Sequence, residues 1–592
     1  MIEVLSTNIL SPLGETTEAN LAAVLRGDSA VRLWSGHWGL PYAFQAALFS
    51  DEQTQRWMVP GQPRFFSLAM TSIRQALAEA PDIDRRRTRL VLSTTKGNVE
   101  ALTLSPGDDD QALPPSASAD MLDVQLGLDG HPLVVDNACI SGLSALIVAS
   151  RLLLSGECDS VIVCGAEVQS AFIVSGFQAL KAMSAHCCRP FDIERTGLNL
   201  GEAAATIILR RSENTTTRWR LEAGAMANDA YHLTSPLPKA EGAWRALKSI
   251  LQGHDAERLA CVSAHGTATL FNDQMESIAI ERAGLESVPV VGLKAYFGHT
   301  MGACGVLESA LMMAALDEGF IPATLGYSER GVSAPIQVTT APLPTQKKAF
   351  IKMLSGFGGA NAAVWFDKKP ATQATQDVTA LSSETDAEKS EADAEKSEAD
   401  AETAEAKVSC LHEVEITPTR VAVDGHEVPC QSAGKALLTE LYKRMVGDYP
   451  RFYKMDLHSR LGFLAAELLL KADDVKDETA ISDCAVVLFG RHGSVAADRN
   501  YLRTIATPDD FYPSPERFIY TLPNIVTGEI AIRHQLHAET TFIYLPRYNE
   551  PGLRHLIQVC ARQISSKYLL TGWIDAENDK NYFAKLRLLR RT

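Results

Sequence analysis

Short apolar runs alternate with longer amphipathic stretches along the first 370 residues. The shorter runs have the length and composition of strands, at Arg89–Ser93, Leu133–Asp136, Ser160–Cys164, Ala204–Leu209, Ala260–Ser263, Val288–Val291, Lys348–Met353 and Ala362–Phe366. The stretch Ser141–Ser155 stays apolar for longer and predicts a buried helix. Strands that alternate with helices favour a layered α/β fold in which helices cover a mixed or parallel sheet.

The apolar pattern stops near residue 369 and returns near residue 410. Beyond that point, Cys484–Gly490 predicts a strand and Leu461–Leu470 predicts a helix. The chain therefore divides into a large α/β domain over residues 1–368, a linker over 369–408 and a smaller α/β domain over 409–592. A length of 592 residues also favours several folding units.

Three tandem heptads, DAEKSEA, DAEKSEA and DAETAEA, occupy residues 386–406 of the linker. Their nine acidic residues and two lysines contribute −7 to the formal net charge of −16. Alanine at heptad spacing is too small to drive a strong coiled coil, so we expect a flexible spacer rather than a solvated helix. Because the charge balance is negative, we expect no binding of nucleic acid.

Eleven cysteines without a repeating spacing argue against a disulfide framework, and the absence of a CxxC pair argues against a metal site. The start of the chain has neither the basic nor the apolar region of a signal peptide. The most apolar stretch, Leu143–Leu154, contains Arg151 and is too short to span a bilayer. We therefore expect a cytoplasmic protein without a membrane span.

Cys139 is a candidate nucleophile in the segment VVDNACISGLSAL. The predicted strand before it runs into a tight turn, and small residues from Gly142 onward open the predicted helix. Small neighbours leave room for a substrate, and the helix N-terminus favours a thiolate. A core cysteine before a helix is the alternative interpretation.

Two histidines follow predicted strands in glycine-rich segments. His265 stands in HGTAT, where Thr267 and Thr269 offer hydroxyl groups to an amide-rich ligand arm. His299 stands in KAYFGHTMGACGVLE, between Lys294 and Glu308. A lysine near a buried histidine needs a carboxylate partner, and Glu308 is the natural candidate, although a surface lysine and a solvated glutamate are the alternative.

A glycine loop, GFGGAN, follows at residues 356–361. Its backbone N–H groups, around Phe357 and Gly358, would stabilise an oxyanion. The motifs NACISG, HGTAT, KxxxxHTMGAxGxxE and GFGGAN, together with RPFDIERTGLNLGEAA at Arg189–Ala204, occur in the order found in the β-ketoacyl-acyl-carrier-protein synthases of the thiolase superfamily. The chain resembles this family across residues 1–370. The resemblance implies a thiolase-like layered α-β-α-β-α fold.

The resemblance also implies a reaction. Cys139 would accept an acyl group from an acyl carrier protein. His265 and His299 would hold the thioester carbonyl of a malonyl carrier protein and promote loss of carbon dioxide, and the enolate would attack the acyl-cysteine. The pair of histidines is typical of elongating synthases, whereas thiolases have a histidine and a second cysteine.

The remaining roles are implied in the same way. Backbone N–H groups of Cys139 and Phe357 would form an oxyanion hole, and Phe357 would gate the acyl pocket. Lys294 with Glu308 would order the site around His299. The two threonines would hold phosphopantetheine, the carrier's arm, so no bound cofactor and no metal are expected. The implied partners are an acyl carrier protein and a second synthase-like chain in a homodimer or heterodimer.

The sequence departs from the family in three places. The stretch before Cys139 is shorter, Thr196 replaces an aspartate, and Ala203 replaces the second glycine of GEG. None of these changes removes a catalytic group, but they leave acyl length, dimer partner and pocket shape open. The compact form resembles synthases of aryl polyene or flexirubin-type pigment pathways.

The smaller domain echoes the first domain. PRFYKMDLHSRLGFLAAELLL and CAVVLFGRHGSVAADRNYL, from Pro450, repeat the helix–strand–turn–helix order found from Pro63, which is a weak internal repeat. Ser514–Leu536 is similar to the helix before the nucleophile strand, and Thr541–Leu545 to that strand. Aligning Gln535 with Gly127 places Arg547 where Cys139 stands, so we expect a non-catalytic truncated synthase half.

Three alternatives stay open. The basic C-terminal residues Lys585, Arg587, Arg590 and Arg591 would attract an acidic carrier protein, but a solvated terminus is favoured. The first domain could be a partner subunit similar to a chain-length factor, although such subunits usually lose the cysteine. A thiolase-like or decarboxylase-only enzyme would keep the fold and change the chemistry.

Overall fold

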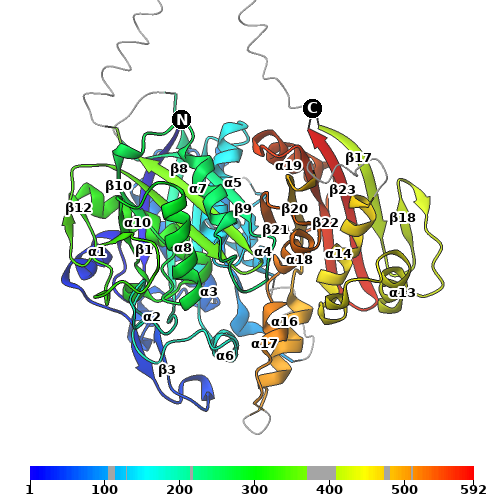
Figure 1. Cartoon of the computed structure of the whole chain (residues 1–592), viewed down its shortest axis with the longest axis horizontal. Coiled ribbons are helices and arrows are strands. Elements are labelled where there is room, and N and C mark those ends of the chain that lie inside the picture. The colour runs from blue at the N-terminus through cyan, green and yellow to red at the C-terminus, as the bar shows by residue number, and fades with distance from the viewer. Residues whose placement is uncertain are drawn as a thin grey trace, which may run out of the picture.

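The computed structural model describes residues 1–104, 114–128, 130–213, 218–369, 408–471, 481–507 and 511–591. The predicted acidic linker lies almost wholly outside these residues, so its conformation stays a prediction. Figure 1 shows the first unit, in blue to green, beside a smaller second unit in yellow to red. Within the described residues, we find no helix that is both long and apolar enough to cross a bilayer.

The first unit begins with a mixed sheet. Its strands are, in spatial order, β5 (Leu133–Val135), β4 (Thr88–Ser93), β6 (Ser160–Glu167), β8 (Ala203–Arg211) and β1 (Ile2–Leu10). The first three run parallel, and β8 is antiparallel to both of its neighbours. All eight residues of β6 are buried, which requires helices on both faces.

A second mixed sheet follows. Its strands are, in spatial order, β9 (Arg220–Asn228), β16 (Ala360–Asp367), β15 (Ala349–Gly356), β10 (Leu259–Ser263), β11 (Pro289–Val291) and β13 (Gln337–Val338). Helices α5 (Ser141–Leu154) and α10 (Cys304–Asp317) lie between the two sheets. Outside them, α3 (Arg64–Ala78) covers the first sheet, and α7 (Glu241–Leu251) and α8 (Leu270–Arg282) cover the second. The predicted five-layered fold is confirmed.

The central helices are buried along nearly their whole length because both of their faces meet a sheet. They also cross each other closely. A Cβ atom on Gly142 of α5 would lie 3.0 Å from the Cα atom of Gly305 on α10. This contact brings the N-terminal ends of the two helices together, next to Cys139 and His299.

The second unit repeats the first sheet. Its strands are, in spatial order, β21 (Thr540–Tyr544), β20 (Cys484–Gly490), β22 (Tyr568–Asn578), β23 (Asn581–Arg591) and β17 (Val408–Ile416). The order and directions match those of β5, β4, β6, β8 and β1. Helices α13 (Lys435–Met445) and α14 (Leu457–Leu470) lie on one side of this sheet, and α19 (Glu550–Gln563) lies on the other. This shared strand order is what the predicted resemblance to a synthase half implies.

The two sheets join edge to edge through β5 and β21. Val135 pairs with Ile543, and Val134 pairs with Tyr544, in an antiparallel register. Because Gln535 aligns with Gly127 at an offset of 408, Val135 pairs with its own counterpart. Gly127 and Gln535 both end a helix in the left-handed conformation. The units are therefore related as the two halves of a twofold-symmetric dimer are.

The interface between the units is buried and contains paired charges. Arg151 of α5 donates two hydrogen bonds to Glu539, at 2.8 and 2.5 Å, and both side chains are less than a tenth exposed. Lys96 lies 2.8 Å from Asp498 of helix α16 (Val495–Leu502). Apolar residues of both units belong to the same core clusters. We therefore expect the described units to unfold together.

In the second unit, the face of the sheet that carries α19 also bears a charged network. Arg587 of β23 pairs with Glu413 of β17 and with Glu550, and Lys585 also lies near Glu413. Tyr548 packs against Trp573 beside this network. In the first unit the corresponding face meets central helices and a second sheet. Two residues of the predicted basic tail are thus paired inside the fold.

Some predicted boundaries were wrong. The helix predicted over Ser514–Leu536 is two helices, α17 (Pro515–Ile519) and α18 (Ile525–His534), with Pro523 between them. Proline lacks an N–H and clashes with the preceding turn, so a single helix could not pass through this point. Strands β22 and β23 were not predicted; in β23, buried Arg587 and half-buried Lys585 interrupt the apolar pattern.

Replacing Glu539 with glutamine should destabilise the whole protein. The substitution leaves the buried Arg151 guanidinium without its countercharge, which costs about 3–5 kcal/mol. The free energy of unfolding, from urea denaturation, should fall by this amount in one transition. Arg26→Gln breaks an exposed pair with Asp28 and should cost less than about 1 kcal/mol. A Glu539→Gln loss no larger than this control would contradict the prediction.

Candidate active site

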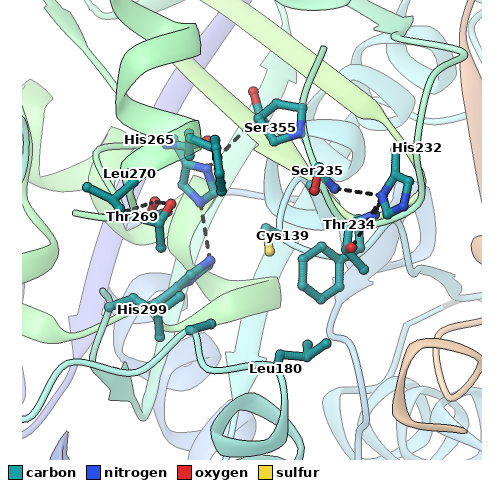
Figure 2. Close-up of a pocket in the computed structure, with 18 of the residues that line it drawn as sticks. Cys139, Leu180, His232, Thr234, Ser235, His265, Thr269, Leu270, His299 and Ser355 are labelled. Carbon is teal, nitrogen blue, oxygen red and sulfur yellow. Dashed lines mark hydrogen bonds between the residues drawn. The ribbon is translucent and has the colours of Figure 1, made fainter. Parts of the chain in front are cut away.

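Cys139 lies in the turn between β5 and α5, and it is 8% exposed. Its neighbour Ala138 has a φ of 50°, a left-handed conformation that sharpens the turn. The cysteine lines a pocket of about 330 Å³. Figure 2 shows it between His265 and His299 on one side and the segment 232–235 on the other.

The electrostatic surroundings of Cys139 favour the neutral thiol. Burial raises the pKa of the thiol to about 12, with a smaller contribution from Cys304. The backbone N–H groups of Phe357 and of Cys139 itself donate toward the sulfur and act to lower the pKa. The expected thiolate at the helix N-terminus is therefore outweighed by burial, and these N–H groups point where an oxyanion would form.

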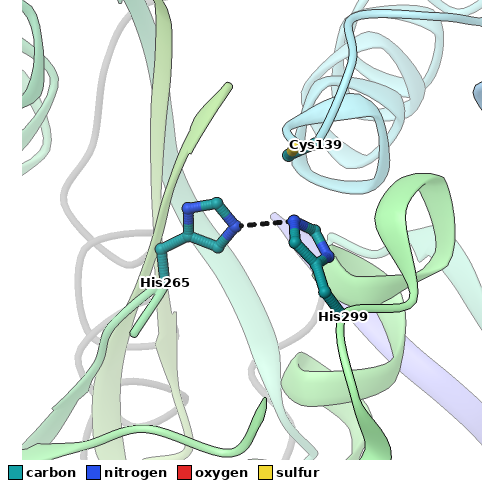
Figure 3. Close-up of side chains that lie close together, drawn as sticks. All are labelled: Cys139, His265 and His299. Carbon is teal, nitrogen blue, oxygen red and sulfur yellow. Dashed lines mark hydrogen bonds between the residues drawn. The ribbon is translucent and has the colours of Figure 1, made fainter. Parts of the chain in front are cut away.

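The two histidines face each other beside the cysteine (Figure 3). His265 Nε2 and His299 Nε2 are 3.2 Å apart, and these atoms and the Cys139 sulfur all lie within 4.8 Å of one another. Burial, with Lys294 as the next contribution, lowers the pKa of both rings well below the usual value. Both histidines are therefore neutral near pH 7.

The backbone assigns the tautomer of each ring. The Met301 N–H donates to His299 Nδ1 at 3.0 Å, and the Ser355 N–H donates to His265 Nδ1 at 3.4 Å. With Nδ1 accepting, each neutral ring carries its hydrogen on Nε2; two such N–H groups 3.2 Å apart cannot bond each other, so together they call for an acceptor placed between them. The site therefore presents two N–H donors that converge on one point, which suits a carbonyl oxygen that becomes an enolate oxygen.

Lys294 and Glu308 form the predicted buried pair, 2.5 Å apart. Burial acts to lower the pKa of Lys294, but Glu308 holds it above its usual value, at about 12. Sequence analysis missed a third member, Lys352 of β15, which lies 2.5 Å from Glu308. Its side chain is fully buried, and it donates to the carbonyl of Ala264 at 2.8 Å. Two lysines thus flank one glutamate beside the histidines.

Of the other predicted residues, the two threonines and Phe357 line this pocket, whereas Gly358 does not and uses its N–H elsewhere. Thr267 and Thr269 lie together, with hydroxyl oxygens 2.9 Å apart, where they face the pocket. Phe357 stacks on Phe177 at a centroid distance of 6.1 Å. These two rings line both the main pocket and a small second pocket that also reaches Cys139. Gly358 follows with a φ of 87° and donates its N–H to the Leu233 carbonyl at 2.7 Å.

The segment 228–236 was missed by sequence analysis. Asp229 lines the pocket and accepts a hydrogen bond from Asn361 Nδ2 at 3.1 Å, so it connects this segment to the glycine loop. His232 also lines the pocket. The signal was the polar cluster NDAYHLTS after a strand, which resembles an ordinary surface turn when it is considered alone.

The spacing of Cys139, His265 and His299 would also suit a thiophilic metal ion. The charges around the site oppose the binding of such an ion. Lys294 and Lys352 both act to lower the pKa of the two histidines, so the surroundings are electropositive. A dication would meet the same repulsion.

Comparisons with known proteins agree with this geometry. The β-ketoacyl synthase N-terminal domain matches residues 2–215, and the β-ketoacyl synthase C-terminal domain matches residues 220–328. The 3-oxoacyl-[acyl-carrier-protein] synthase 2 of Rhizobium meliloti is 28% identical over 413 residues, covering 61% of this chain and 97% of that protein.

Two solved structures share the fold. The ketosynthase ApeO of Xenorhabdus doucetiae, solved in complex with its chain length factor ApeC, is 24% identical and has a TM-score of 0.54; the match covers 62% of this chain and 98% of that chain. The PfaC keto synthase–chain length factor is 14% identical and has a TM-score of 0.74. Its match covers 100% of this chain and 78% of that chain.

A buried cysteine beside two neutral histidines, held in five α/β layers, defines a thiol-dependent acyl-transferring enzyme. The chain belongs to the β-ketoacyl synthase family. The prediction of a β-ketoacyl-acyl-carrier-protein synthase is thereby confirmed, while the roles of its individual residues stay predictions.

Replacing Lys352 with methionine should shift the acid limb of the pH–rate profile upward. If neutral histidines are required, activity is lost as the pH falls through their lowered pKa. Removing one nearby positive charge raises that pKa, by up to about 1 unit. The measurement is kcat/KM between pH 5 and 8. Lys368→Met, at the half-exposed pair with Asp317, serves as the control. An unshifted limb in an active Lys352→Met enzyme would contradict the prediction.

Proposed function

We propose that this enzyme catalyses decarboxylative condensation of an acyl group with malonyl-acyl carrier protein. One observation carries the proposal: the Cys139 sulfur and a ring nitrogen of each histidine lie within 4.8 Å of one another in one pocket, and the two Nε2 atoms face each other at 3.2 Å. A nucleophile and a carbonyl-binding pair at this separation serve the two reacting carbons of a carbon–carbon condensation. Thr267 and Thr269 in the pocket wall support binding of a phosphopantetheine arm.

The first half-reaction loads the cysteine. The sulfur attacks the thioester carbonyl of an acyl carrier protein, the carrier thiol leaves, and it takes up the proton of the Cys139 thiol. The tetrahedral oxyanion would be held by the backbone N–H groups of Cys139 and Phe357, which already point toward the sulfur.

The second half-reaction forms the new bond. His265 and His299 would donate from Nε2 to the thioester carbonyl of malonyl carrier protein, so carbon dioxide leaves and an enolate remains. The enolate carbon attacks the acyl-cysteine carbonyl, the carbon–sulfur bond breaks, and the sulfur leaves as thiolate, which takes up one proton from solvent. The products are β-ketoacyl carrier protein, carbon dioxide and free enzyme.

Intact-protein mass after mixing with an acyl carrier thioester tests the first half-reaction. Wild type should gain one acyl group, and Cys139→Ala should gain none, because the nucleophile is absent. Cys187→Ala removes an exposed cysteine outside the site and should be acylated like wild type. Adding malonyl carrier protein should release β-ketoacyl product only where the adduct formed. Acylation of Cys139→Ala, or none of folded wild type, would refute the assignment and favour the partner-subunit alternative.

We also propose that residues 408–591 act within the chain as a length-determining partner. The second unit occupies the edge of β5 that a separate synthase-like chain would otherwise use. The similar structures that include a chain length factor support this role. On this proposal, the partner expected as a second chain is supplied by the same polypeptide.

The second pocket is the physical basis of this role. Cys139, Phe177 and Phe357 of the first unit line it, together with Phe518 and Leu522 of the second. Phe518 projects over Gly176 of α6 (Ala171–Ala179), where a Cβ atom would lie 2.2 Å from its ring. The glycine thus admits the ring, and the ring forms part of the pocket wall.

Phe518→Ala should lengthen the acyl chains that the enzyme accepts. Removing the ring opens space at this wall, so longer primers should load on Cys139 and longer products should appear by mass spectrometry. The new cavity should also destabilise the fold, by about 3–5 kcal/mol. Tyr512→Ala, at an exposed aromatic residue of the same segment, should leave the product distribution unchanged. An unaltered distribution in folded Phe518→Ala would count against the proposal.

A further inference from the structure

The second unit reaches the glycine loop at residues 356–361 through one side chain. Asn524, at the start of α18, donates from Nδ2 to the Phe357 carbonyl at 2.9 Å. The asparagine is 1% exposed and belongs to the unit that lacks a nucleophile. The contact therefore joins that unit to a residue whose own N–H points at the Cys139 sulfur.

Asparagine at the start of a helix ordinarily caps it, by accepting a hydrogen bond from a backbone N–H group of the first turn. Asn524 makes no such bond to α18. Its Oδ1 has no hydrogen-bond partner among the described residues, while its Nδ2 is used on the loop. Turning the amide over would place its oxygen against the Phe357 carbonyl oxygen, so the bond also determines the amide orientation.

The backbones of α18 and the loop are in contact at the same place. Gly358 has a φ of 87°, which favours glycine, and Gly528 lies against it. A Cβ atom on Gly528 would be 2.8 Å from the Cα atom of Gly358. The loop thus rests on the helix with no side chain between them, so a shift of either is transmitted to the other.

The neighbouring segment 228–236 is held from the second unit as well. Gln535 donates to the Ala230 carbonyl at 3.0 Å, and the Asn228 N–H donates to the His537 carbonyl at 3.1 Å. The Asn228 side chain then bridges Thr540 of β21 and the Gly358 carbonyl, at 2.9 Å each. Both segments that border Cys139 are therefore anchored outside the first unit.

We propose that Asn524 is a positioning residue. By holding the carbonyl of Phe357 it fixes this residue, whose N–H in the preceding peptide group can then stabilise the oxyanion at Cys139. The second unit thereby completes the active site of the first. This role rests on the proposed condensation, and it is distinct from the part of Phe518 in the wall of the acyl pocket.

Asn524→Leu removes the hydrogen-bond donor and keeps a side chain of similar size. The expected result is a kcat for condensation lower by on the order of tenfold, with KM for the acyl carrier changed less than about threefold, because the loss falls on the transition state. Asn500→Leu, at an exposed asparagine of the same unit, should behave as wild type. Melting temperatures of both variants, measured beside wild type, show whether the protein is folded.

Asn524→Asp provides a rescue that a purely structural role would not produce. A buried carboxyl favours its protonated form, which has one O–H to donate to the Phe357 carbonyl. The kcat of Asn524→Asp, relative to wild type at each pH, should therefore be close to normal at acidic pH and should fall as the pH rises. Asn524→Leu should stay low at every pH.

A second variant tests the contact between α18 and the glycine loop without changing the Asn524 hydrogen-bond donor. Gly528→Ala places a methyl group against Gly358 and should lower kcat in the same direction, even where Asn524→Leu fails to fold. Gly552→Ala on α19 meets only the Asn549 side chain, at 3.2 Å, and serves as its control.

Hydrogen exchange by mass spectrometry tests the positioning without any carrier protein. Peptides that cover residues 355–361 should exchange roughly fivefold to tenfold faster in Asn524→Leu, and peptides of β20 should be unchanged. Unchanged exchange in the loop together with kcat within twofold of wild type would overturn the proposal. An inactive wild type would refute the condensation itself, and the exchange result would still decide whether Asn524 holds the loop.

Discussion

The edge-to-edge pairing of β5 with β21 is the interaction on which the rest of the structure depends. Cys139 follows β5 directly, so the strand that carries the nucleophile is held by an element about 400 residues away in the chain. A three-residue strand at the edge of a sheet would leave its backbone donors and acceptors unpaired. Pairing with β21 satisfies them and fixes the turn in which the cysteine lies.

Burial is the second constraint, and it governs the charges of the site. A thiol and two histidines in a water-poor pocket are all neutral at rest, because burial disfavours the charged form of each group. Glu308 lies between Lys294 and Lys352, and these three buried charged groups are next to the neutral ones. The site is therefore suited to stabilising charge that appears only during the reaction.

The second unit shows how half of a synthase can be stable. It keeps the sheet that forms the interface and the helices on one face, and its other face carries α19 and the ion pairs around Arg587. Arg547 stands where the first unit has Cys139. The second unit nevertheless contributes Phe518 to the pocket beside Cys139, and Asn524 donates a hydrogen bond to the glycine loop. On the function proposed above, one polypeptide supplies both the active site and the partner surface that supports it.

The sequence by itself determined the layered fold, the family and the residues that meet in the pocket, because Cys139, His265 and His299 stand in local motifs with fixed spacing. It also indicated a repeated half-domain, since helices and strands recur in the same order. Only the tertiary structure showed that Lys352 joins Glu308, because a single lysine inside an apolar strand looks like an exposed residue of that strand. No local pattern encodes contacts between distant segments. The pairing of β5 with β21 is such a contact, and so is the hydrogen bond from Asn524 to Phe357.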